Sequence, residues 1–223
     1  MKVRLILLFV CVVSIIPVMS QNKSGHYFLF PDYKEALIYY KDGRQFTAPV
    51  NFDLQAGHFL FIDAKDKKAK QFAYPEKIAF MQIEGRNFLL SENEAVEILQ
   101  ATPLFQVAYS GNLRQAPKNL TYGGTTQTAA VDSYGGYSGN ANLISQQHSK
   151  SRVVMGVNKN YKAKFRKKNK QFNNSKTFIK AFPKETRSIV AEYIQANHVD
   201  FDNVNQVFKL YERFIPLWNI DDK

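Results

Sequence analysis

The sequence predicts an α+β protein in which an N-terminal antiparallel β-meander is joined by a flexible Gly/Ser/Thr-rich connection to a β-hairpin and about three helices. Apolar residues mostly alternate with polar ones from about Glu35 to Tyr109, which is the period of half-buried strands. Small and polar residues dominate from Gly111 to about Lys150. Before Pro216, apolar residues recur every three or four positions, which is the period of helices packed on a core.

The chain begins with the pattern of a cleavable secretory signal. Lys2 and Arg4 precede an apolar run over residues 5–16, and residues 17–20 supply a proline and small side chains for a peptidase. The run is too short for a membrane anchor, because a membrane-spanning helix needs about 20 apolar residues. We therefore expect cleavage after Ser20, and no further run approaches membrane-spanning length.

Cys11 is the only cysteine and lies inside the apolar leader. Phe9 and Val10, which precede it, are larger than the small residues that a lipoprotein peptidase needs. A mature chain without cysteine forms no disulfide and has no thiolate chemistry. With 45% hydrophobic and 14% aromatic residues, the chain can instead be held together by an apolar core.

The net charge favours an anionic partner. Removing Lys2 and Arg4 lowers the formal charge from +11 to +9, which is still strongly basic. Such a balance favours association with anionic lipids, glycans or nucleic acid. Outside the cytoplasm, nucleic acid is the least available of the three.

Asp42-Gly43 is the clearest hairpin signal of the meander, because an Asp-Gly pair tolerates the positive φ of a two-residue turn. A two-residue loop there sets Tyr39 opposite Phe46 and Leu37 opposite Ala48.

Two further hairpins and two further segments complete the predicted meander. A second hairpin about Glu84-Gly85 sets Met81 opposite Phe88, and a third pairs residues 50–54 with residues 59–62 around Ala56-Gly57. Residues 92–99 fit a short helix or a strand, and residues 104–109 fit a strand.

The C-terminal part is expected to begin with a hairpin that pairs residues 153–157 with residues 161–165 around residues 158–160. A first short helix follows, capped by Asn174 or Ser175, and Pro183 opens the second helix. Asp202 or Asn203 caps the third helix. The apolar stripes of the three helices are Phe178, Ile179 and Phe182; Ile189, Val190, Tyr193 and Ile194; and Val204, Val207, Phe208, Tyr211, Phe214 and Ile215.

These patterns divide the chain into four parts. We expect a signal peptide over residues 1–20, a β-meander domain over residues 21–110, a flexible linker or long loop over residues 111–150, and a basic hairpin with a helical segment over residues 151–223.

Three stretches resemble a group of uncharacterised exported proteins of Bacteroides-like bacteria. They are the KDGRQFTAP motif within Tyr40–Pro49, the YGGTTQT patch over Tyr122–Thr128, and the helical tail from Phe178 to Leu210. The resemblance implies bacterial export and the two-part layout. It implies no active site, because none of these stretches is tied to a reaction.

A basic run over residues 159–170 is the most specific candidate site. Two aromatic residues, Tyr161 and Phe165, interrupt its positive charges, so it could contact an anionic polymer through ion pairs and ring stacking. In a strand, Lys162, Lys164 and Arg166 would share one face, as they also do in an ordinary solvated hairpin. The candidate residues are Lys159, Lys162, Lys164, Arg166, Lys167, Lys168 and Lys170.

Motifs for metal or nucleophilic chemistry are weak. The histidines His26, His58, His148 and His198 have no zinc-site spacing, and residues 200–205 lack the glycine and glutamate of a calcium loop. Residues 136–140 depart from GxSxG, since Asn140 stands where glycine is needed. Asp53, Asp63 and Asp132 are candidate acid-base carboxylates only if folding brings them together. The sequence therefore assigns no catalytic residue, metal ligand or cofactor.

The sequence favours an exported protein of the periplasm or cell surface that binds or scaffolds without catalysis. Its expected partner is an anionic envelope glycan or lipid, or another envelope protein docking on an uncovered edge strand. One alternative is an envelope hydrolase with a carboxylate site not visible in the sequence. The other is an anionic glycan- or lipid-binding protein that uses residues 159–170.

Overall fold

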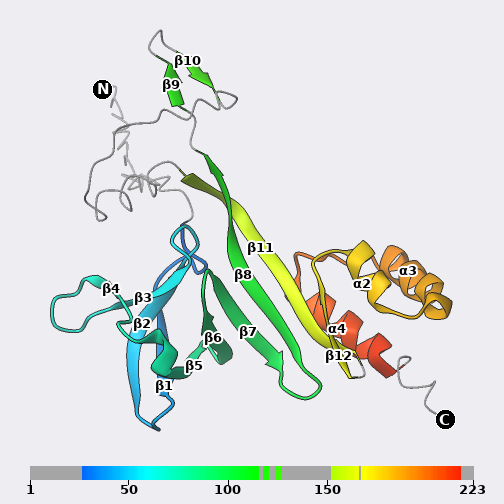
Figure 1. Ribbon diagram of the computed structural model, residues 1–223, viewed down its shortest axis with the longest axis horizontal. Helices are drawn as coiled ribbons and strands as arrows, with labels where there is room; N and C mark the ends of the chain where they lie inside the picture. Colours follow the sequence, from blue (N-terminus) through cyan, green and yellow to red (C-terminus); the bar gives the residue numbers. More distant parts are fainter. Residues whose placement is uncertain (1–26, 116–117, 121–123, 127–151, 166, 217–223) are drawn as a thin grey trace, which may run out of the picture.

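The computed structural model describes residues 27–115, 118–120, 124–126, 152–165 and 167–216 (Figure 1). In these residues, ten strands form one antiparallel sheet and three helices follow at the C-terminus, which confirms the predicted α+β class. β9 (Lys118–Leu120) and β10 (Gly124–Thr126) form a separate two-stranded sheet. No helix in the described ranges is long and apolar enough to cross a membrane.

The first eight strands follow the alternating part of the sequence. They are β1 (Lys34–Tyr40), β2 (Gln45–Asp53), β3 (His58–Ile62), β4 (Ala69–Gln71), β5 (Ile78–Ile83), β6 (Arg86–Ser91), β7 (Glu94–Gln100) and β8 (Phe105–Gln115), with the short 3-10 helix η1 (Pro75–Lys77) before β5. β5 returns to pair with β1, so the sheet order is β12-β11-β8-β7-β6-β5-β1-β2-β3-β4. The segment over residues 92–99, for which the sequence fits a helix or a strand, contains a turn at residues 92–93 and most of β7.

The predicted register of the first hairpin is wrong by one residue. Of the Asp42-Gly43 pair, only Gly43 has a positive φ, of 87°, and its amide closes a turn onto the Tyr40 carbonyl. The Asp42 carboxylate accepts a hydrogen bond from the Arg44 amide, which stabilises a loop longer than two residues. The observed pairs are Ile38 with Phe46, Leu37 with Thr47 and Ala36 with Ala48.

The other two meander hairpins form as predicted. Met81 lies opposite Phe88, and both Glu84 and Gly85 have a positive φ, as a two-residue turn of this type requires. β2 and β3 pair on either side of the Ala56-Gly57 turn.

The predicted hairpin around residues 158–160 is wrong. β11 (Arg152–Phe165) is one continuous strand that pairs with β8, and it turns instead into β12 (Lys168–Phe172). Asn158, Lys159 and Asn160 pair with Ser110, Tyr109 and Ala108 of β8. The backbone of a long partner strand therefore overrides the turn propensity of two asparagines.

The sheet curls, so that β3 lies across β6 and β7 and encloses an aromatic core. Phe59 of β3 packs edge-on against Phe88 of β6 with ring centroids 6.2 Å apart, and Phe30 meets the same ring at 5.8 Å. Phe59 is 4% exposed and Phe88 is fully buried. Edge-to-face aromatic pairs of this kind contribute about 1 kcal/mol each beyond the area they bury.

The helices cover the same face of the sheet farther along, over β8, β11 and β12. They are α2 (Ser175–Ala181), α3 (Arg187–Ala196) and α4 (Val204–Phe214), with the 3-10 turn η2 (Lys184–Thr186) before α3. The predicted caps Asn174 and Asn203 each accept a hydrogen bond from the first turn of their helix. Phe165 of β11 meets Phe182 with ring centroids 5.3 Å apart, and Phe105 of β8 meets Tyr211 at 4.9 Å. One stripe residue, Ile189, is 54% exposed and lies outside this core.

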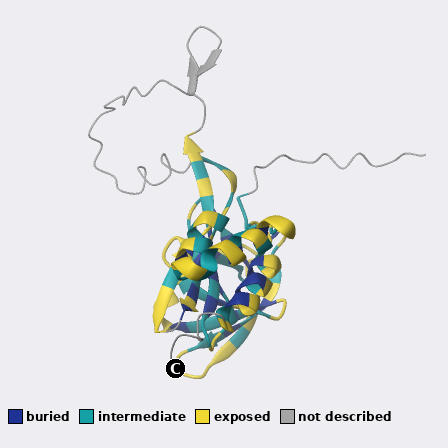
Figure 2. Ribbon diagram, turned by 90° about the vertical axis from the view of Figure 1, so that its right-hand side faces the viewer, coloured by how far each residue is buried: buried dark blue, intermediate teal, exposed yellow. Residues whose placement is uncertain are grey.

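β8 and β11 continue beyond the sheet as a two-stranded ribbon. β8 runs through Gly111, where the sequence indicated the start of a linker, and ends at Gln115 opposite Arg152. None of residues 110–115 or 152–158 is buried, and Figure 2 shows the ribbon rising from the body. Gly111 lies at its base, where the backbone passes so close to the Leu54 carbonyl that a Cβ would clash with it. Most of the predicted linker lies outside the described residues.

Candidate functional site

Strand pairing places polar side chains in a row across three strands. Gln106 of β8, Lys162 of β11 and Gln171 of β12 lie opposite one another. Residues directly opposite each other in neighbouring strands point to the same side of a sheet. The same side therefore also contains the residues two positions along, and we call this surface the polar face: Gln106, Asn160, Lys162, Lys164, Asn169 and Gln171.

The polar face exists because β11 alternates. Tyr161, Ala163 and Phe165 are buried under the helices, and Lys162 and Lys164 point to the opposite side. The Tyr161 hydroxyl donates a hydrogen bond to the Phe201 carbonyl at 2.8 Å, which ties the strand to the loop before α4. The helices thus hold one face of β11 and leave its lysines on the other.

A groove of about 500 Å³ lies on part of the polar face, where Gln106, Asn160, Lys162 and Gln171 line it and Lys164 and Asn169 do not. Val96 and Ala108, 7% and 8% exposed, line it as apolar residues, with Glu94 and Thr177 among its polar lining residues. Within the part of the chain that the structure describes, the side chains of Gln106, Asn160, Lys162 and Gln171 have no hydrogen-bond partner. Their donors and acceptors are available to a ligand.

The other predicted basic residues do not join Lys162 and Lys164. Lys168 and Lys170 of β12 lie opposite Phe165 and Ala163, and so on the face that the helices cover. Lys159 donates a hydrogen bond to the Asp202 carbonyl at 2.7 Å. Lys167 is exposed in the β11–β12 turn, and Arg166 lies outside the described residues. The basic run is therefore divided between two faces of the sheet.

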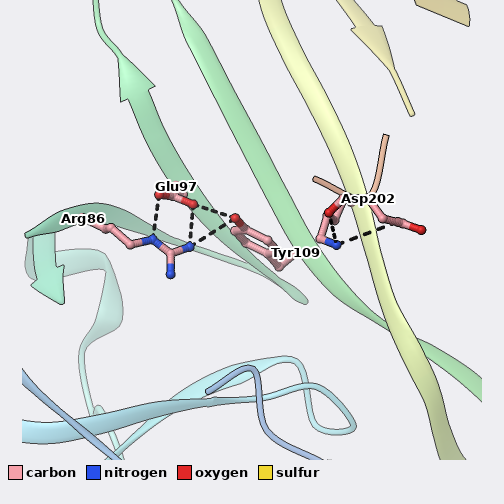
Figure 3. Close-up of polar contacts among 5 residues, drawn as sticks. Arg86, Glu97, Tyr109 and Asp202 are labelled. Atoms are coloured by element: carbon pink, nitrogen blue, oxygen red, sulfur yellow. Dashed lines mark hydrogen bonds and ion pairs between the residues drawn. The ribbon is translucent and has the colours of Figure 1, made fainter. Parts of the chain in front are cut away.

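A second cluster of polar side chains lies inside the curled sheet. Glu97 of β7 accepts two hydrogen bonds from the Arg86 guanidinium, at 2.8 and 2.7 Å, and one from the Tyr109 hydroxyl at 2.6 Å (Figure 3). The Glu97 side chain is 9% exposed and that of Arg86 is 38% exposed. Burial and the Glu97 carboxylate raise the pKa of Tyr109 above its ordinary value, and the hydrogen bond to Glu97 raises the pKa of Arg86. Because both oxygens of Glu97 accept hydrogen bonds from these partners, we interpret the cluster as structural.

The predicted acid-base carboxylates lie in turns. Asp53 accepts hydrogen bonds from the amides of Gln55 and Ala56, and Asp63 forms an ion pair with Lys70 at 2.6 Å. That hydrogen bond from Lys70 lowers the pKa of Asp63. Asp132 lies outside the described residues. The structure thus gives Asp53 and Asp63 turn-stabilising roles and does not pair them.

Metal and nucleophile candidates remain unsupported where the structure describes them. The described residues contain no group of three or more His, Cys, Asp or Glu side chains that could hold a metal ion. Asp200 accepts a hydrogen bond from the Asp202 amide, and Asn203 caps α4, so the stretch over residues 200–205 forms a helix entry. The segment over residues 136–140, His26 and His148 lie outside the described ranges.

Comparisons with protein-family models, with curated proteins and with solved structures find no match to this chain.

Proposed function

We propose that the protein is exported across the bacterial inner membrane and acts in the cell envelope, in the periplasm or at the cell surface, as a non-enzymatic binding protein. The leader over residues 1–20 supports export. A formal net charge of +11, or +9 without Lys2 and Arg4 of the leader, supports an anionic ligand. The polar face is the binding surface in this proposal, and the ligand is an anionic glycan.

The observation that supports this ligand is the row formed by Gln106, Lys162 and Gln171. Each amide both donates and accepts hydrogen bonds, which suits sugar hydroxyl groups, and the ammonium of Lys162 pairs with a carboxylate or sulfate. Lys164 supplies a second charge beside Asn169. Glu94, which lines the same groove, accepts hydrogen bonds from hydroxyl groups.

The mixture of amides and charges favours a glycan over a lipid surface. Binding to an anionic membrane surface depends chiefly on clustered lysines and arginines near the membrane. Here the amides of Gln106, Asn160, Asn169 and Gln171 outnumber the lysines of the polar face. A hydroxyl-rich acidic polymer can bind both, because its hydroxyl groups form hydrogen bonds with the amides and its acidic groups form ion pairs with the lysines.

The test removes two charges from the polar face. The protein is applied to immobilised polygalacturonate, a polymer of uronic acids, and to vesicles containing phosphatidylglycerol. We expect salt-sensitive retention on the polymer that Lys162→Gln/Lys164→Gln weakens roughly fivefold, because each exposed ion pair contributes up to about 1 kcal/mol.

Lys168→Gln/Lys170→Gln is the matched control, because it removes the same charge from β12 on the opposite face. Its retention should equal that of the unchanged protein. Equal losses in both variants would show that net charge alone is responsible and would contradict the proposal. Retention on vesicles but not on the polymer would show that the ligand is an anionic lipid and would contradict the proposed glycan.

A further inference from the structure

A second cavity, of about 550 Å³, lies where the β2–β3 hairpin and β4 approach the β6–β7 turn. Its volume is within the range of small-molecule sites. Phe59, Phe72 and Leu90 form its apolar lining, and Gln71, Glu76 and Glu92 supply polar groups. It meets the groove of the polar face only at the β6–β7 turn, where Ser91 lines both.

One wall of the cavity is held by close backbone contact. Gly57 has a φ of 75°, and a Cβ at this position would lie 2.8 Å from the Asn93 Cα. Asn93 itself has a φ of 62°. Only glycine fits position 57, because a side chain there would both adopt a strained backbone and push Asn93 away. This contact fixes the position of the Gly57–Asn93 wall of the cavity.

Hydrogen bonds orient the histidine of the cavity. His58 Nδ1 lies 3.2 Å from the Ala56 carbonyl oxygen, and His58 Nε2 lies 2.6 Å from Gln71 Nε2. The carbonyl oxygen can accept a hydrogen bond from one ring nitrogen and the Gln71 amide lies against the other, so the two contacts hold the ring in place.

The charge of the cavity is opposite to that of the protein. Glu76 and Glu92 line it, and its lining includes no lysine or arginine. Neither carboxylate has an ion-pair partner among the described residues. The nearby Lys77 lies over the Tyr74 ring, 4.2 Å from its centroid, and is not part of the lining.

We propose that this cavity binds a small organic ammonium ion with an apolar body. The carboxylates of Glu76 and Glu92 attract the ammonium group, and Phe59, Phe72 and Leu90 contact the apolar body. This inference is independent of glycan binding, since it uses other side chains and a ligand of opposite charge.

The test compares two probes that differ only in charge. 2-Phenylethylamine, which is cationic at neutral pH, and 2-phenylethanol, which is neutral, are titrated into the protein by NMR. We expect the amine to shift the resonances of Gly57, Gln71 and Asn93, and the alcohol to bind about tenfold more weakly or not at all. Equal binding of the two probes would overturn the proposal.

Glu76→Gln/Glu92→Gln should weaken binding of the amine about tenfold, because it removes both charges without changing side-chain size. Glu185→Gln/Glu212→Gln is the matched control, since these exposed carboxylates lie in η2 and α4, away from the cavity. Unchanged binding in the first variant, or equal losses in both, would contradict the proposal. Phe72→Ala should also weaken binding, which checks the contact with the apolar body.

Discussion

Arg86 and Glu97 form a two-pronged ion pair between β6 and β7, with Nε to Oε1 and Nη2 to Oε2 distances of 2.8 and 2.7 Å. The guanidinium also lies over the Phe88 ring, 5.0 Å from its centroid. A buried carboxylate depends on such partners, because its charge is otherwise poorly solvated. The ion pair therefore stabilises a carboxylate that would otherwise be poorly solvated inside the curled sheet.

Arg86→Met is expected to lower the free energy of unfolding by about 2 kcal/mol, because it leaves the Glu97 carboxylate with the Tyr109 hydroxyl alone. The expected loss is below that for a fully buried pair, since the Arg86 side chain is 38% exposed. Urea denaturation measures it. Arg86→Met/Glu97→Leu/Tyr109→Phe, which also removes the hydroxyl that Glu97 accepts from, should recover most of the loss, and a triple variant as unstable as the single one would contradict this interpretation.

Gly111→Ala should lower the free energy of unfolding by about 3 kcal/mol, because the new Cβ would clash with the Leu54 carbonyl oxygen. Gly156→Ala, on the paired strand, is the control, since a Cβ there meets nothing within 4 Å. Thermal unfolding of both variants compares them. Similar melting temperatures for the two would show that the ribbon base tolerates a side chain.

Stability should fall at alkaline pH. Burial raises the pKa of Tyr211 from 10.0 to about 12. The protonated hydroxyl therefore stabilises the folded state fully below pH 10.0, and this contribution is lost as the pH rises to about 12. Burial also raises the pKa values of Tyr109 and Tyr161, so they add to the same loss. Melting temperature as a function of pH measures the effect.

Tyr211→Phe should reduce the fall in melting temperature at alkaline pH. At neutral pH it should cost about 1 kcal/mol, because it removes the 2.6 Å hydrogen bond to the Lys164 carbonyl. Tyr74→Phe, at a side chain that is 60% exposed, is the control. An alkaline profile identical to that of the unchanged protein would show that Tyr211 does not contribute.

Export predicts a processed N-terminus. Protein isolated from the envelope of its native host should begin at Gln21, because the small residues before it suit the peptidase. N-terminal sequencing and intact mass check this. Recovery of a chain that begins at Met1 would remove the support for export and for the proposed envelope role.

Local sequence patterns predicted much of the fold. The Glu84-Gly85 turn and the Asn203 cap depend on neighbouring residues, so the sequence predicts them. The predicted register at Asp42-Gly43 was wrong because the Asp42 carboxylate accepts a hydrogen bond from the Arg44 amide, which stabilises a longer loop. The continuous β11 was missed because its long pairing with β8 joins residues far apart in the sequence.

The candidate sites were only partly predictable. Alternation along β11 predicted that Lys162 and Lys164 share a face. Gln106 and Gln171 join them through strand pairing, which no local pattern reveals. The cavity with Glu76 and Glu92 depends on how the sheet curls, so no spacing in the sequence indicated it. Long-range geometry therefore determined both sites.

The ladder of β8 and β11 ends with Gln115 beside Arg152. The chain leaves and re-enters the sheet at neighbouring points. A segment inserted between these two points therefore does not have to span a particular distance across the protein. Loop-closure entropy changes only slowly with length. This position is therefore suited to accept a foreign domain, such as a fluorescent reporter, while the sheet and helices keep their arrangement.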